Sequence, residues 1–87
     1  MTDDDITVDA LVRELSVDKV AAAELAALTE RQRECLLLAA KGLSSVEIGK
    51  ALFISYKTVE HHMKGMRAAL EMTTIEAAVL ACKAGWL

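Results

Sequence analysis

The chain contains no proline, only four glycines, and only one residue each of phenylalanine, tryptophan and tyrosine. Alanine, leucine and valine supply most of its apolar residues, which make up 54% of the sequence. So few helix breakers and so many small aliphatic residues favour close-packed helices over a β-sandwich. A chain of 87 residues is most simply one domain, and a domain of this size is only marginally stable.

Several other features are missing. No stretch approaches the roughly 18 apolar residues needed to cross a membrane, and the acidic residues 1–5 lack the basic and apolar regions of a secretory signal. Cys35 and Cys82 form neither a disulfide framework nor a zinc pattern. The adjacent His61 and His62 would point about 100° apart on a helix and do not form a metal site. We therefore expect a cytoplasmic protein with no membrane segment, cofactor or metal.

No set of nucleophile, base and orienting residue can be assembled, and no glycine-rich phosphate loop is present, so we expect no enzyme. The net charge of −3 argues against non-specific binding to nucleic acid. Its distribution is uneven, however. Residues 1–28 hold seven acidic and two basic residues, a net of −5, whereas residues 29–87 hold six acidic and eight basic residues, a net of +2. The basic part permits DNA binding without requiring it.

Three segments carry the capping-box pattern, in which a Ser or Thr and a Glu or Gln three residues later satisfy each other's backbone amides. They begin at Thr29, Ser44 and Thr73, and Ser55 is a fourth candidate N-cap. Gly42 and Gly85 stand where helices should end. These signals predict helices near 30–41, 45–52, 56–71 and 74–84.

Apolar residues at helical spacing support three of these helices. They are Cys35, Leu36, Ala39 and Ala40 in the first, Val59, Met63, Met66 and Leu70 in the third, and Ile75, Ala78, Val79 and Cys82 in the last. We expect the Cys35, Met63 and Met66 side chains to pack in the core. His62 is interpreted as a half-buried structural residue, and Trp86 is expected to pack the chain end against the body.

The connection from Leu52 to Ser55 is only three or four residues long and carries apolar side chains. Two helices joined so tightly cross at a steep angle, which is the helix-turn-helix arrangement. Leu52 and Ile54 are expected to fill the corner between them.

Residues 7–28 carry an apolar stripe of Val8, Leu11, Val12 and Leu15, and then a second apolar run over 17–28. The pattern predicts one or two helices. These helices would pack on the rest of the domain, form a dimer surface or act as a regulatory arm, and residues 1–6 are expected to be loose.

Residues 28–36, Gly42-Leu43-Ser44 and Glu47-Ile48 resemble the opening of the LuxR-type (GerE-like) DNA-binding domain. The resemblance continues through Leu52, Ile54-Ser55, Thr58-Val59, His62, Leu70, Ala78-Val79, Ala81 and Gly85. It implies an all-α fold, with a four-helix LuxR-type helix-turn-helix domain over residues 28–87. The charge and the apolar runs of the preceding residues predict an acidic helical extension over residues 1–27. The resemblance also implies that the second and third helices form the DNA-reading unit, that the third enters the major groove, and that the fourth commonly supports dimerisation.

The third helix carries most of the candidate DNA contacts, because its polar residues lie opposite its apolar stripe. The N-terminal side chains of such a helix reach base edges. Lys57 and Lys64 would meet phosphates or guanine, Tyr56 a phosphate or a thymine methyl, and Glu60 a cytosine. The predicted DNA-binding residues are Ser45, Tyr56, Lys57, Thr58, Glu60, His61, Lys64 and Arg67. The alternative is an ordinary solvated face of mixed charge.

Two functions stay open at this point. The first is a transcriptional regulator that binds double-stranded DNA as a homodimer. The second is a protein-interaction module of the same fold, with weakened DNA binding, that pairs with and restrains another regulator. The second is favoured by Glu60, Gly65, Ala69 and Ile75, which stand where the family usually carries other residues, and by the acidic extension. In a variant that joins the two, the acidic extension folds over the basic domain and weakens DNA binding until it is displaced.

Overall fold

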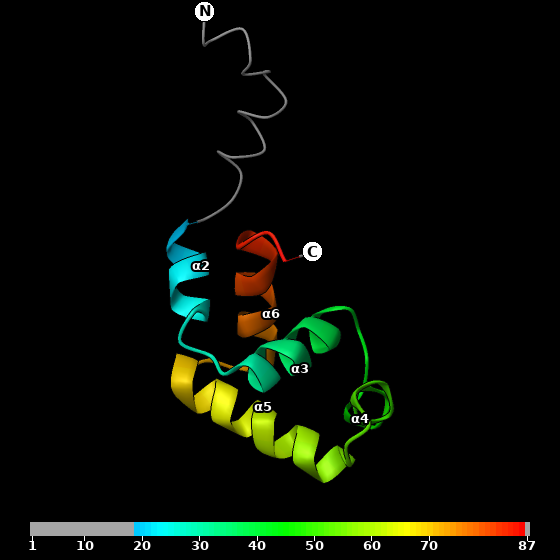
Figure 1. Cartoon of the computed structure of the whole chain (residues 1–87). Helices are drawn as coiled ribbons and strands as arrows, with labels where there is room; N and C mark the ends of the chain where they lie inside the picture. Colours follow the sequence, from blue (N-terminus) through cyan, green and yellow to red (C-terminus); the bar gives the residue numbers. More distant parts are fainter. Residues whose placement is uncertain (1–18, 87) are drawn as a thin grey trace, which may run out of the picture.

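A computed structural model describes residues 19–86 of the chain. This part folds into five helices, which are α2 (Lys19–Leu25), α3 (Glu30–Ala40), α4 (Ser45–Leu52), α5 (Tyr56–Leu70) and α6 (Thr74–Lys83) (Figure 1). The all-α fold is confirmed, with a helix preceding the four expected ones. Each of those four begins and ends within one residue of its predicted bounds. The apolar stripe from Val8 to Leu15 lies outside the described residues.

The predicted capping boxes begin α3, α4 and α6. The backbone N–H of Gln32 donates to Thr29 Oγ1 at 3.1 Å, and the Thr29 N–H donates back to Gln32 Oε1 at 3.1 Å. Ser44 pairs with Glu47, and Thr73 with Glu76, in the same way. Each box satisfies two amides that a helix start leaves without partners, and a cap of this kind typically stabilises the fold by about 1 kcal/mol.

The core takes side chains from every helix. Leu25 of α2 and Leu36 of α3 are fully buried together with Ile48 of α4, Val59 and Met66 of α5, and Ala77 and Ala81 of α6. Cys35 also lies in this core, and its burial raises the pKa of its thiol above the ordinary value. The predictions that Cys35, Met63 and Met66 are core residues and that Trp86 packs against the body are confirmed.

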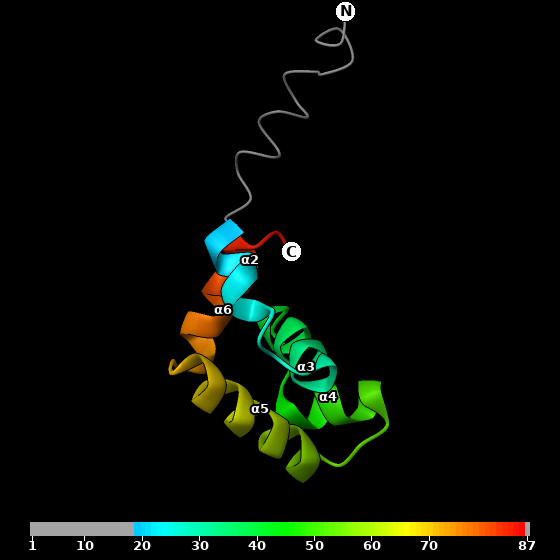
Figure 2. The same ribbon diagram turned by 60° about the vertical axis from the view of Figure 1, so that its left-hand side comes forward.

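Helix α5 lies at one end of the described part of the protein. Helix α3 contacts both α5 and α6, α2 lies against α6, and α4 crosses α5. In both views the start of α2 and the C-terminal end lie together, at the opposite end from α5 (Figures 1 and 2). One side of α5 is therefore packed against the other helices, and its other side has none of them on it.

The prediction for the buried face of α6 is wrong, because the larger apolar residues of this helix do not form it. Ile75 and Val79 are 79% and 51% exposed, and Cys82 is exposed as well. The buried residues are Ala77 and Ala81. Because α2 and α3 both lie against α6, small alanine side chains allow a close approach that larger residues would prevent.

Candidate nucleic-acid interface

The start of α5 is fixed by Ser55. Its Oγ accepts a hydrogen bond from the Thr58 backbone N–H at 3.2 Å, and the Ser55 and Thr58 hydroxyl oxygens lie 2.9 Å apart. Tyr56 is the first residue of α5, Lys57 the second and Thr58 the third. The N-cap therefore places these side chains on the first turn of α5, where the helix dipole favours a negatively charged ligand.

Helix α5 has a sharply divided surface. Val59, Met63 and Met66 are buried against the core. Tyr56 is 52% exposed, and the side chains of Lys57, Glu60, His61 and Lys64 are also exposed. The division expected from the apolar spacing is confirmed, and the outer face of α5 consists of polar and charged side chains.

The turn between α4 and α5 brings the two helices close together. Phe53, at the C-terminal end of α4, adopts the left-handed conformation with φ of 59°, and its N–H donates to the Gly49 carbonyl. Leu52 and Ile54 pack against the core, as predicted, whereas the Phe53 side chain is 95% exposed. The chain thus reverses without a glycine in the turn itself.

The glycine that permits this approach lies inside α4. A Cβ atom on Gly49 would stand 2.6 Å from the Ile54 carbonyl oxygen and 3.3 Å from the Tyr56 nitrogen. Both distances involve backbone atoms, which cannot rotate away. Gly49 therefore sets the distance between α4 and the start of α5, a role that the spacing of the sequence did not reveal.

Three cationic side chains lie along α5, but they are not equivalent. Lys57 and Lys64 are exposed, and no ion pair within residues 19–86 involves either of them. Arg67 is half-buried, and its Nη1 donates to Thr74 Oγ1 at 3.1 Å. The two lysines are consequently available to a ligand, while Arg67 already joins the far end of α5 to the start of α6.

Glu60 is the acidic residue on this face, and it joins the two helices of the turn. Its carboxylate accepts a hydrogen bond from the Ser45 hydroxyl at the start of α4. The two residues are 15 positions apart in sequence, so no local pattern indicated the contact. The eight predicted residues thus lie on α5 and on the first residue of α4, with Arg67 at the distal end.

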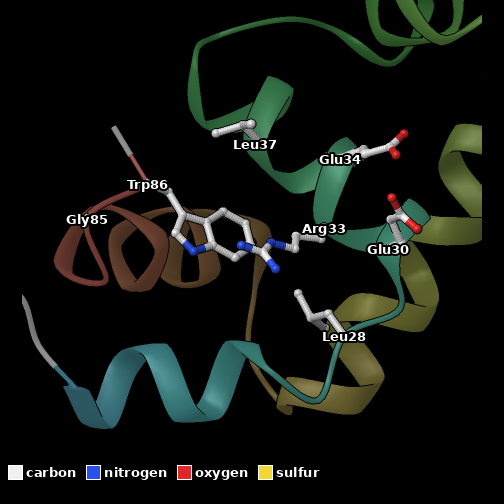
Figure 3. Close-up of a pocket in the computed structure, with 7 residues that line it drawn as sticks. All are labelled: Leu28, Glu30, Arg33, Glu34, Leu37, Gly85 and Trp86. Carbon is white, nitrogen blue, oxygen red and sulfur yellow. The ribbon is translucent and has the colours of Figure 1, made fainter.

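The clearest hollow in the described residues lies elsewhere. It has a volume of about 680 Å³ and is lined by Leu28, Glu30, Arg33, Glu34, Leu37, Gly85 and Trp86. Figure 3 shows the Arg33 side chain reaching from α3 over the Trp86 ring, and the guanidinium carbon is 5.0 Å from the ring centroid. No residue of α5 lines this hollow, so it is separate from the candidate interface.

Residues 19–86 show neither a metal-binding cluster nor a membrane-spanning helix. No group of three or more His, Cys, Asp or Glu side chains in this range is placed to hold a metal ion. The His61 and His62 rings meet edge to face, 5.9 Å between centroids, and His62 is half-buried. None of the five helices is long and apolar enough to span a bilayer.

A short helix, a tight turn and a second helix with a free outer face define this chain as a helix-turn-helix protein. Comparison with known families identifies which one. Residues 26–82 match the model of the luxR family of bacterial regulatory proteins (GerE), and the chain belongs to this family. It carries a LuxR-type helix-turn-helix DNA-binding domain, and the family is one of regulatory proteins and not of enzymes.

Curated relatives agree with the family match. The chain is 45% identical over 53 residues to the response regulator protein VraR of Staphylococcus aureus, Staphylococcus epidermidis and Staphylococcus saprophyticus. The matched segment covers 61% of this chain and 25% of each relative, so the chain matches about a quarter of their length. No solved structure matches the chain with significance.

Proposed function

We propose that this chain is a transcriptional regulator that inserts α5 into the major groove of double-stranded DNA. The observation that carries the proposal is the outer face of α5, where Lys57 and Lys64 are exposed and make no ion pair within residues 19–86. Membership of the LuxR family gives this face its context. A regulator that binds DNA in this way would act in the cytoplasm.

The position of each side chain along α5 suggests its role. Residues at the start of a recognition helix reach base edges, so Tyr56 and Lys57 are closest to the bases, with Thr58 and His61 beside them. Lys64, two turns further along, is suited to a phosphate or a guanine. Arg67 is hydrogen-bonded to Thr74 and, of the residues predicted on α5, lies furthest from the first turn. We therefore assign it a contact with the phosphate backbone of the DNA and none with a base.

We propose that the regulator is a homodimer that pairs through α6. Ile75 and Val79 are one turn apart on the same side of α6, and both are largely exposed. Two such domains would present their α5 helices to half-sites about 34 Å apart, one turn of DNA. Sedimentation of the Val79→Lys variant should show a monomer where the wild type sediments as a dimer, and Phe53→Ser, which removes an exposed apolar side chain outside α6, should not change the mass.

Fluorescence anisotropy with duplex DNA over a salt series tests the proposed DNA binding. Each neutralised phosphate contributes a slope of about −0.9 to log affinity against log salt. Lys57→Ala and Lys64→Ala should each weaken binding and flatten the slope by about one for each subunit in contact. Lys19→Ala is the matched control, because Lys19 is an exposed lysine at the start of α2, outside both α5 and the proposed dimer face of α6. Absence of binding by the full chain at 50 mM salt would contradict the proposal.

The competing function is a protein-interaction module that pairs with and restrains another regulator. Two observations favour it, namely the carboxylate of Glu60 between the lysines of α5 and the exposed apolar residues of α6. Both fit a domain that has exchanged DNA contacts for protein contacts. A chain that dimerises through α6 yet binds no duplex at low salt would favour this module over the DNA-binding regulator.

A further inference from the structure

We propose that Glu60 selects a cytosine in the DNA site, and that Ser45 holds its carboxylate in the reading position. The inference rests on the proposed insertion of α5 into the major groove and adds the base that one of its side chains reads. The charge of Glu60 is unexpected, because its exposed carboxylate lies on the face of α5 that would meet negatively charged DNA.

The position of Glu60 is well defined. It follows the first turn of α5, with Lys57 three residues before it and Lys64 four residues after it on the same side of the helix. The Ser45 hydroxyl donates to Glu60 Oε1 from the start of α4. Oε2 makes no ion pair within residues 19–86. One oxygen of this exposed carboxylate is thus anchored, which restricts the orientation of the other.

The chemistry of a carboxylate limits what it can meet in a groove. An ionised Glu only accepts hydrogen bonds, and phosphates, like the base acceptors, repel it. The major groove offers two donors, the N4 amino group of cytosine and the N6 amino group of adenine. Adenine places the N7 acceptor beside N6, where it would face the second carboxylate oxygen, whereas cytosine has no acceptor of its own on that edge. Cytosine is therefore the better partner.

The flanking lysines suit the other half of the same base pair. Guanine, which pairs with cytosine, presents the acceptors N7 and O6 in the major groove, and lysine is a suitable donor to them. Glu60 accepts a hydrogen bond and lies between Lys57 and Lys64, which donate. This order matches a cytosine whose guanine partner, or a guanine in the next base pair, accepts from a lysine. The bond to Ser45 reduces the entropy lost when the carboxylate is ordered against the base.

A purely structural explanation would make Glu60 only a link between α4 and α5. The variant Glu60→Gln separates the two explanations, because its carbonyl oxygen still accepts from Ser45 while its amide group can now donate. Glutamine pairs with adenine through N6 and N7. If Glu60 reads a base, this variant should change the preferred base from cytosine to adenine, and if Glu60 is only a link, the preferred site should not change.

The experiment selects binding sites from a random duplex library with the full chain and then measures affinities for single-base changes. Replacing the selected cytosine should weaken wild-type binding by about 5- to 150-fold, the usual effect of one mismatched base pair. Glu60→Ala should abolish that discrimination at this one position, and Ser45→Ala should reduce it there. The matched control is Glu71→Gln, which removes an exposed carboxylate at the other end of α5. Circular dichroism confirms that each variant is folded.

The outcomes are distinguishable. A wild type that selects a site, combined with a Glu60→Ala variant that keeps the same preference at every position, would overturn this inference and leave DNA binding intact. A wild type that binds no duplex would overturn the inference together with the proposed function. Loss of the cytosine preference in Glu60→Ala, with its replacement by adenine in Glu60→Gln, supports the inference.

Discussion

Gly49 allows a quantitative test of how α4 and α5 are held together. In Gly49→Ala the new Cβ atom would lie 2.6 Å from the Ile54 carbonyl oxygen, so the turn must open. Overpacking of this kind costs typically 1–3 kcal/mol. Alanine recovers about 1 kcal/mol, because it is the better helix former. Because the contact is with backbone atoms, we expect the cost to exceed the gain, with a net loss of up to about 2 kcal/mol in the free energy of unfolding.

Gly65→Ala provides the matched control, since Gly65 also lies inside a helix. There the new Cβ atom would meet Nε2 of Gln32 at 2.7 Å, the far end of a flexible side chain. The amide oxygen of Gln32 accepts from the Thr29 N–H in the capping box of α3, so moving this amide offsets part of the gain in helix propensity. We expect the free energy of unfolding to stay within about 1 kcal/mol of the wild type. Urea unfolding followed by circular dichroism measures both variants. A Gly49→Ala protein as stable as Gly65→Ala would refute the argument that backbone contact sets the α4–α5 distance.

Two further predictions concern the ends of the helices. Phe53→Gly should raise the free energy of unfolding by about 0.5–1 kcal/mol in the same urea assay. Glycine removes the strain of the left-handed conformation, which outweighs the greater freedom of the unfolded chain, and the Phe53 ring is almost fully exposed. A fall in stability would show that the ring has a packing partner. The pKa values of Glu47 and Glu76 lie below the ordinary value of 4.5, because each carboxylate accepts from the backbone N–H and then from the hydroxyl of its cap residue. Their contribution to stability is fully present above pH 4.5 and is lost as the pH falls through the lowered values. Glu47→Gln and Glu76→Gln keep the capping acceptor, as Gln32 does in α3, so they should reduce the acid sensitivity measured by thermal unfolding between pH 7 and pH 3, and an unchanged pH profile would contradict this assignment.

The sequence predicted the helices well because their starts depend on local chemistry. Thr29, Ser44 and Thr73 each cap a helix through a residue three positions later, so the signal is complete within four residues. The spacing of Val59, Met63 and Met66 identified the buried face of α5 for the same reason, since one helix determines it. These features account for most of the fold and for the position of the candidate interface.

The features that the sequence did not reveal depend on how helices meet. The bond from Ser45 to Glu60 and the bond from Arg67 to Thr74 each join two different helices. The contact at Gly49 depends on the angle at which α4 approaches the start of α5. The buried face of α6 was also hidden, because its packing uses small residues such as Ala77, whereas the pattern of larger apolar residues led to Ile75 and Val79.

The most direct test of the central claim is a map of where duplex DNA touches the chain. Backbone amide chemical shifts of the labelled protein would be followed during titration with a selected duplex at low salt. Binding through α5 predicts the largest changes at residue 45 and at residues 56–64, with the indole signal of Trp86 unchanged. Changes confined to α6 and the hollow beside Trp86, or no changes at all, would contradict the claim that the exposed face of α5 reads DNA.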